Sequence, residues 1–282
     1  MRPVLTLLGC DLFGGIVEDA LPVAYAGELF HNFTLMHDDI MDNAPMRRGM
    51  ETVHEKFNVS SAILSGDVML IYGYKFLEKL SSDKFQKVIS VFNDTAVKVC
   101  EGQQYDMNFE NEKAVSLEAY LEMIEYKTAV LLASSLKCGA LVAGANDGDG
   151  DLIYEFGRNI GMSFQLMDDL LDVFGESGNT GKMVGGDIEE NKKTFLLIKA
   201  LEMAEGEEYD KLNYYLNNNI PRNDKIEGVK QIFENLGIEE LTRKEINKYH
   251  AIALSKLDAI SVDEERKTVL KNYAEDLLQR IQ

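Results

Sequence analysis

The chain has 282 residues, and its 29 basic and 48 acidic residues give a formal net charge of −19. Hydrophobic residues make up 45% and charged residues 27%, which is ordinary for a soluble globular protein and excludes a low-complexity chain. The acidic balance excludes nucleic acid as a partner, because its phosphate backbone selects clustered lysine and arginine. No stretch reaches the roughly 18 uninterrupted apolar residues of a membrane span, and three scattered cysteines with no signal-peptide pattern predict a reducing, cytoplasmic location.

The apolar pattern is helical nearly throughout. Apolar residues recur at three- and four-residue steps, and glycine or proline breakers separate the periodic segments at 14–15, 43–45, 144–150 and 175–186. We therefore predict an all-α fold in a single domain spanning residues 1–282. The more polar part from about residue 205, with predicted helices over 239–255 and 263–281, is expected to form a peripheral layer.

The acidic loop at 146–151 is similar to the start of a calcium-binding loop. An EF-hand needs a glutamate at its twelfth position, and that position is Arg158 here. We therefore expect a solvated loop between two helices.

Two acidic motifs share the pattern DDxxD, at residues 38–42 and 168–172, and each ends an apolar helical stretch. On a helix the first and last aspartates of such a motif lie on one face, roughly 6 Å apart. Carboxylates this close repel one another, and Mg²⁺ relieves the repulsion while binding phosphate oxygens and water. A solvated acidic helix end explains a single motif equally well, but two copies favour a metal site. The candidate ligands are Asp38, Asp39, Asp42, Asp168, Asp169 and Asp172.

Basic residues accompany both motifs, against the net charge of the chain. Each one alone is explained by an exposed surface charge. Together with metal-binding acids, they indicate a polyphosphate held by both Mg²⁺ and side chains. They are Arg2, Arg47, Arg48, Lys127, Lys182 and Lys192.

Two polar residues share helix faces with the motifs. His31 stands nearly two turns before Asp38, and Gln165 stands one turn before Asp168 and Asp169. The alignment favours contact with a bound anion for His31 and a place at the same cavity for Gln165. The alternatives are a satisfied core histidine and a helix-packing amide.

In order and spacing, these residues resemble the trans-isoprenyl diphosphate synthases, or polyprenyl synthetases. The resemblance runs from Arg2 to about Ala200. It rests on many short pieces: Arg2-Pro3, Glu28-x-x-His31, residues 37–42, Arg47-Arg48-Gly49, Thr52-x-His54, Ser65-Gly66-Asp67, Gly102-Gln103, Lys127-Thr128, residues 164–172, Thr180-Gly181-Lys182, and Gly186-Asp187 through Lys192-Lys193-Thr194.

The resemblance implies a helical bundle around a deep central cavity, with the two acidic motifs facing each other across its mouth. It implies three Mg²⁺ ions with substrate bound, with Asp38, Asp42 and Asp168 as direct ligands and the other motif aspartates in supporting contacts. It further implies an allylic diphosphate clamp of Arg47, Lys127, Lys182 and Lys192, an isopentenyl diphosphate site of Arg2, His31 and Arg48, and neighbours of the developing allylic cation at Thr128 and Gln165.

The implied reaction condenses isopentenyl diphosphate with dimethylallyl, geranyl or farnesyl diphosphate and releases diphosphate. In this family, the residues four and five positions before the first motif block the tunnel, and they correspond to Thr34 and Phe33. One aromatic residue there, with no insertion inside the motif, resembles synthases of geranylgeranyl or farnesyl diphosphate. Core packing is the alternative role of Phe33. A homodimer is implied as well.

The sequence departs from the family pattern at its beginning. The family usually starts with a helix and a Gly-Lys-Arg-x-Arg-Pro motif, whereas this sequence starts at Met1-Arg2-Pro3. We expect that the family's first helix, and the lysine that binds isopentenyl diphosphate, are missing.

Two other functions stay open. A class I terpene cyclase also uses DDxxD and Mg²⁺, although its second motif normally reads Asn/Asp-x-x-Ser/Thr-x-x-x-Glu. A catalytically impaired or regulatory partner subunit would explain the missing lysine.

Overall fold

The structure is a computed structural model that describes residues 1–175 and 184–279. The predicted all-α fold is confirmed, since the strands of the described residues are only the two-residue pair β1 (Met46–Arg47) and β2 (Met50–Glu51). The helices are α1 (Arg2–Leu12), α2 (Val17–Met41), α3 (Val53–Lys56), α4 (Val59–Leu77), α5 (Ser82–Asn111), α6 (Leu117–Ile124), the π-helix η1 (Glu125–Ala129), α7 (Val130–Val142), α8 (Asp147–Phe174), α9 (Gly186–Glu189), α10 (Phe195–Met203), α11 (Gly206–Asn217), α12 (Arg222–Asn235), α13 (Ile238–Asp258) and α14 (Glu264–Gln279).

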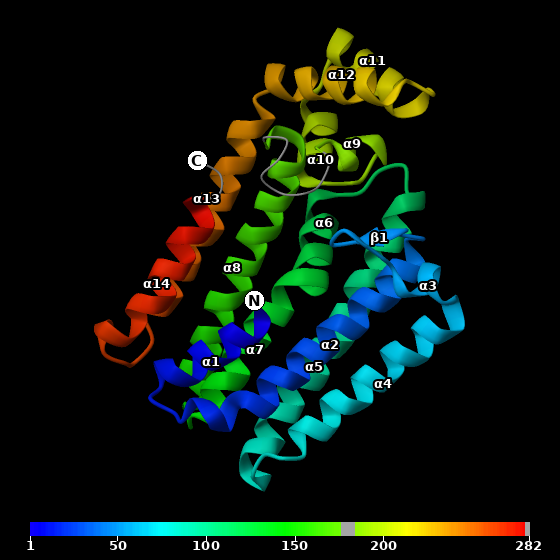
Figure 1. Cartoon of the computed structure of the whole chain (residues 1–282). Coiled ribbons are helices and arrows are strands. Elements are labelled where there is room, and N and C mark those ends of the chain that lie inside the picture. The colour runs from blue at the N-terminus through cyan, green and yellow to red at the C-terminus, as the bar shows by residue number, and fades with distance from the viewer. Residues whose placement is uncertain (176–183, 280–282) are drawn as a thin grey trace.

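The long helices α2, α4, α5, α7 and α8 form a bundle, with α4 on its outer side (Figure 1). Helix α2 packs on α4, α1 packs on α7, and α13 packs along α8. Helices α11 and α12 lie across one end of the bundle, above α9 and α10 (Figure 1). No helix in the described parts of the chain combines the length and the apolar character needed to cross a bilayer.

Helix α7 is the centre of the bundle, because nearly all its residues are buried. A helix that is apolar on every side is stable only when other helices surround it. The π-helix η1 joins α7 to α6, and two glycines let its neighbours approach closely. Gly102 of α5 lies against the backbone of Lys127, and Gly161 of α8 lies against Ala129. A Cβ atom at either glycine would collide with η1, so the packing of η1 depends on both.

The acidic segment at 146–151 does not form the solvated loop that we expected. The side chain of Asn146 accepts a hydrogen bond from the backbone N–H of Asp149 and caps α8, whose first turn is acidic. Both features stabilise a helix N-terminus. Asp149 is buried, and its carboxylate accepts from the N–H of Ser261. The segment is therefore a helix start that also fixes the α13–α14 connection.

Candidate active site

The first acidic motif ends α2, and a basic hairpin folds back onto it. Asp38 and Asp39 lie in the last turn, and Asp42 is the C-cap residue. Arg47, in β1, places Nε 2.5 Å from Oδ1 of Asp39 and Nη2 3.0 Å from Oδ2 of Asp38. Burial and the neighbouring Asp38 raise the pKa of Asp42 to about 6. This corner of the molecule therefore concentrates negative charge that cations stabilise.

Lys127 in η1 reaches the same corner from the middle of the chain. Its Nζ atom lies 2.5 Å from Oδ2 of Asp106 and 3.3 Å from Oδ1 of Asp38. Burial opposes the charged form, but Asp106 and Asp38 together raise the pKa of Lys127. Asp106 was missed in the sequence analysis. Its signal was its place one turn after the Gly102-Gln103 piece on α5.

The second acidic motif ends α8 and contributes a buried hydrogen-bond chain. Thr128 Oγ1 donates to Gln165 Oε1 at 3.1 Å, and Gln165 Nε2 donates to Asp169 Oδ1 at 3.1 Å. The hydroxyl of Tyr120 donates to the other oxygen of Asp169. Burial raises the pKa of Asp169, and burial with Asp169 raises that of Tyr120 well above its usual range. Both oxygens of Asp169 are thus engaged, while the preceding Asp168 is exposed.

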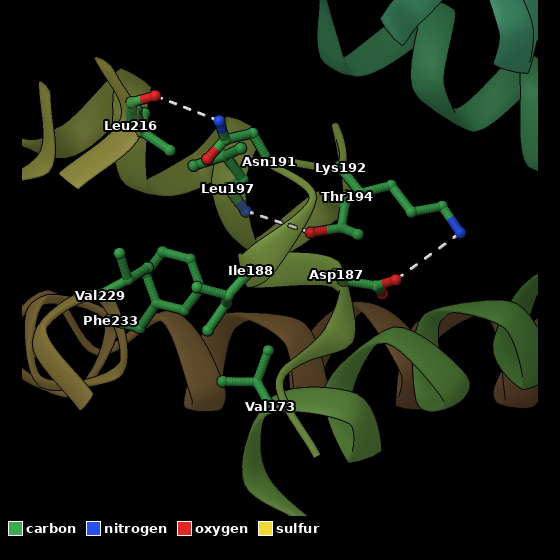
Figure 2. Close-up of a pocket in the computed structure, with 10 residues that line it drawn as sticks. All are labelled: Val173, Asp187, Ile188, Asn191, Lys192, Thr194, Leu197, Leu216, Val229 and Phe233. Atoms are coloured by element: carbon green, nitrogen blue, oxygen red, sulfur yellow. Dashed lines mark hydrogen bonds and ion pairs between the residues drawn. The ribbon is translucent and has the colours of Figure 1, made fainter. Parts of the chain in front are cut away.

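Asp172 connects the second motif to the segment that follows α8. Its Oδ2 atom accepts from the backbone N–H of Asp187 at 2.9 Å. Asp187 lies 3.7 Å from the ammonium of Lys192, and Figure 2 shows the two side chains facing each other at the rim of an apolar pocket. Burial raises the pKa of Asp187 to about 7 although Lys192 opposes the shift. Asp187 belongs to one of the short motifs on which the family resemblance rests, but the sequence did not indicate a specific role for it.

Arg2 and Arg48 form a second cationic group beside His31. Arg2 is partly buried, and its Nε atom has no hydrogen-bond partner among the described residues. Burial lowers the pKa of Arg2 to about 10, although Glu28 opposes the shift. Burial, followed by the charges of Arg2 and Arg48, lowers the pKa of His31 to about 3. His31 is therefore neutral at physiological pH.

Phe33 belongs to a row of rings on α2. Its ring centroid lies 5.8 Å from that of Phe30 and 4.7 Å from that of His37. The hydroxyl of Thr34 donates to the carbonyl of His31 at 2.8 Å, on its own helix. Lys182, from the predicted diphosphate clamp, lies outside the described residues.

The donor chemistry of both motifs fits Mg²⁺, which prefers one or two carboxylates completed by water and phosphate oxygens. Within the described ranges, no group of three or more histidine, cysteine or acidic side chains is arranged to hold a metal ion. Asp38 and Asp39 bind Arg47, Asp169 binds Tyr120 and Gln165, and Asp172 binds a backbone N–H. The aspartates of both motifs are suitable Mg²⁺ ligands, but in this structure their carboxylates bind cationic side chains and hydrogen-bond donors of the chain itself.

Comparison with known proteins decides the family. The sequence profile described as polyprenyl synthetase matches residues 1–236. The chain belongs to the polyprenyl synthetase family. It is an enzyme of the trans-prenyltransferase class.

Two curated relatives are similar to this polyprenyl synthetase. The geranylgeranyl diphosphate synthase of Methanosarcina mazei is 42% identical over 72% of this chain, and the match covers 63% of that relative. The geranylgeranyl diphosphate synthase of Saccharolobus solfataricus is 36% identical over 99% of this chain and 86% of its own length.

Solved structures agree with this assignment. A crystal structure of geranylgeranyl pyrophosphate synthase is 44% identical, with a TM-score of 0.95 over 99% of this chain and 86% of that one. The Corynebacterium glutamicum enzyme, 29% identical with a TM-score of 0.89 over 99% of this chain and 86% of that one, is described in complex with isoprenyl diphosphate and magnesium. The family is Mg²⁺-dependent.

Proposed function

We propose that this polyprenyl synthetase condenses isopentenyl diphosphate with an allylic diphosphate to form farnesyl or geranylgeranyl diphosphate. The observation that carries the proposal is the convergence of Arg47 and Lys127 on Asp38. Two cations from distant parts of the chain meet at an acidic motif that suits Mg²⁺. Such a site matches a diphosphate leaving group, which needs both a metal and fixed positive charges.

Asp38, Asp42 and Asp168 would hold Mg²⁺, three ions when substrate is bound, and the ions would neutralise the diphosphate. Lys127, Arg47 and Lys192 stabilise the charge that develops on the diphosphate when the allylic C1–O bond breaks. The Thr128 and Gln165 oxygens would lie beside the developing allylic cation, and the hydrogen bonds from Thr128 to Gln165 and from Gln165 to Asp169 support this role by fixing both side chains.

The double bond of isopentenyl diphosphate then attacks C1 of the allylic cation. The new C–C bond leaves a tertiary cation, which loses a proton to the released diphosphate. Water must be excluded, because it would convert either cation to an alcohol. The apolar helices around α7 supply that exclusion.

Arg2, His31 and Arg48 are the proposed isopentenyl diphosphate site. The partly buried, unpaired Nε–H of Arg2 suits an anionic oxygen, because a donor left without a partner is costly until a ligand accepts from it. Neutral His31 adds a donor without adding a charge. Phe33, whose ring packs between those of Phe30 and His37, is the proposed barrier that limits product length, with Thr34 beside it.

We propose a second copy of this chain as the occupant of an exposed apolar stripe on α4. Leu64, Val68 and Ile71 are 65%, 53% and 58% exposed and follow one face of the helix at steps of four and three residues. A stripe of this kind marks an interaction surface. Figure 1 places α4 at the outside of the bundle, and the Leu64→Asp variant should convert a dimer to a monomer in analytical ultracentrifugation.

We also propose that the protein is located in the cytoplasm.

A purified-protein assay tests the reaction. Isopentenyl diphosphate and each allylic diphosphate are incubated with the protein, with Mg²⁺ and then with EDTA, and the products are separated by chromatography. We expect a longer linear prenyl diphosphate that disappears with EDTA. A hydrocarbon formed from the allylic substrate alone would instead indicate a cyclase, and the absence of any product would indicate a regulatory subunit.

A further inference from the structure

Helix α12 touches the segment that follows the second acidic motif, defined here as the 184–192 segment. This segment carries Asp187 and Lys192, which Figure 2 shows facing each other at the rim of the apolar pocket. On the side of α8, Asp172 holds it twice: its carbonyl accepts from Gly185 N–H at 2.6 Å and its side chain accepts from Asp187 N–H at 2.9 Å.

The opposite side of the 184–192 segment is held by side chains of α12. Lys225 donates to the carbonyl of Glu189 at 2.8 Å, and Arg222 donates to the carbonyl of Val184 at 3.2 Å. Arg222 also pairs with the Glu189 carboxylate at 2.6 Å. Lys225 is only 8% exposed, whereas the Arg222–Glu189 pair is open to solvent. Because exposed ion pairs contribute little, Lys225 is the stronger anchor.

Close packing reinforces these contacts. Gly185 has a φ of +86°, and a Cβ atom there would lie 2.7 Å from the end of the Ile226 side chain. At the other end of the segment, Asn191 donates to the carbonyl of Leu216 in α11 at 3.1 Å. In Figure 2, Ile188 points toward Val229 of α12, away from Asp187 and Lys192. The 184–192 segment is thus bracketed between α8 and the α11–α12 layer.

We infer that Lys225 and Arg222 of α12 are positioning residues, which fix the 184–192 segment so that Lys192 faces the allylic diphosphate. The inference rests on the proposed function for the identity of that ligand. It gives the layer from about residue 205 a role in substrate binding, although the composition of that layer indicated only a peripheral position. The isopentenyl diphosphate residues lie on α1, α2 and the β1–β2 hairpin, so they do not depend on this bracket.

The test compares Lys225→Met with Lys211→Met. Lys211 lies on neighbouring α11, where its pair with Glu207 is exposed, so the control removes the same charge without touching the 184–192 segment. Hydrogen exchange of the protein without substrate is measured first. We expect exchange in peptides covering 184–192 to be about tenfold faster in Lys225→Met, with other helices unchanged. An unchanged exchange rate in the 184–192 segment, or an equally faster exchange rate throughout the protein, would contradict the inference that α12 fixes this segment.

Kinetics form the second readout. We expect Lys225→Met to raise the KM for the allylic diphosphate about tenfold, and the KM for isopentenyl diphosphate to stay within about twofold. Arg222→Lys should retain more affinity than Arg222→Ala. An equal rise of both KM values would indicate a general structural defect and overturn the inference. An inactive wild-type protein would contradict the proposed function instead, and the exchange measurement would still decide the bracket.

A glycine pair supplies a variant that keeps every charge. Gly185→Ala and Gly206→Ala both place a side chain at positive φ, but a Cβ atom at Gly206 has no described atom within 4 Å. The backbone cost is therefore similar, and only Gly185→Ala pushes on Ile226. We expect only Gly185→Ala to raise the KM for the allylic diphosphate. The same rise in Gly206→Ala would contradict the inference.

Discussion

Lys127 and Asp106 form a 2.5 Å ion pair that joins η1 to α5 beside the first acidic motif. Because Asp106 and Asp38 both raise the pKa of Lys127, the pair keeps its ammonium charged and fixes its direction. We expect Asp106→Asn to lower kcat/KM for the allylic diphosphate about tenfold, since a misplaced cation stabilises the leaving group less well. Steady-state kinetics measure this loss, and Asp94→Asn, at an exposed position of the same helix, is the control. Equal effects of the two variants would contradict a role for the pair.

Phe33 provides a prediction about product length. If its ring closes the end of the cavity, Phe33→Ala opens space toward Phe30, and the product becomes longer. Chromatography of the dephosphorylated products measures the length. Phe57→Ala is the control, because Phe57 is 66% exposed. An unchanged product length in Phe33→Ala would leave Phe33 as a core-packing residue only.

Gly66 of α4 makes room for His37, whose Nε2 atom lies 3.2 Å from the carbonyl of Ile63. The carbonyl can only accept, so Nε2 carries the proton. A Cβ atom at Gly66 would lie 2.5 Å from Nε2, whereas at Gly27 of α2 it would have no described atom within 4 Å. Replacing a helical glycine by alanine adds up to about 1 kcal/mol of stability. We therefore expect Gly27→Ala to raise the free energy of unfolding.

In Gly66→Ala the same backbone gain is opposed by the loss of the His37 hydrogen bond, worth about 1 kcal/mol, and by the steric contact. In urea unfolding, the free energy of unfolding of Gly66→Ala should be lower than that of both Gly27→Ala and the wild type. Gly66→Ala should also lose activity, because His37 directly precedes Asp38. If both variants gain stability equally, the His37 contact is not needed.

The sequence predicted those features of the fold that depend on local spacing. Helical periodicity indicated the all-α class, and the four-residue step between Asp38 and Asp42 placed them at one corner, because helix geometry relates neighbouring turns directly. The start of α8 was predicted wrongly for a local reason as well. Asn146 before an acidic turn is a helix cap, and the resemblance to a calcium loop obscured that signal.

Contacts between distant helices could not be predicted from one sequence. Asp106 and Lys127 meet only because Gly102 lets α5 approach η1, and nothing in the spacing of these residues encodes that approach. Tyr120 is a similar case: nothing in its sequence context indicated that its hydroxyl would bind Asp169 of another helix. Such pairs depend on tertiary packing, which local periodicity does not determine.

His31 leads to a prediction about pH. Its pKa is about 3 in the folded protein, because burial and the charges of Arg2, Arg48 and Arg47 oppose protonation, and it returns to about 6.5 in the unfolded chain. Between these values the unfolded chain binds more protons, so the free energy of unfolding falls as the pH is lowered, with a slope approaching about 1.4 kcal/mol per pH unit for this group. At higher pH the group is neutral in both states and contributes no slope.

The His31→Gln variant should remove this contribution while keeping a neutral polar side chain. Urea unfolding of wild type and variant is measured at several pH values from about 5 to 7, where most carboxylates stay ionised in both proteins. We expect the wild type to lose more stability than His31→Gln on acidification, because only the wild type carries the suppressed imidazole beside Arg2. Parallel curves for the two proteins would show that the pKa of His31 is the same in the folded and unfolded chains, and would contradict its suppression by burial and the neighbouring arginines.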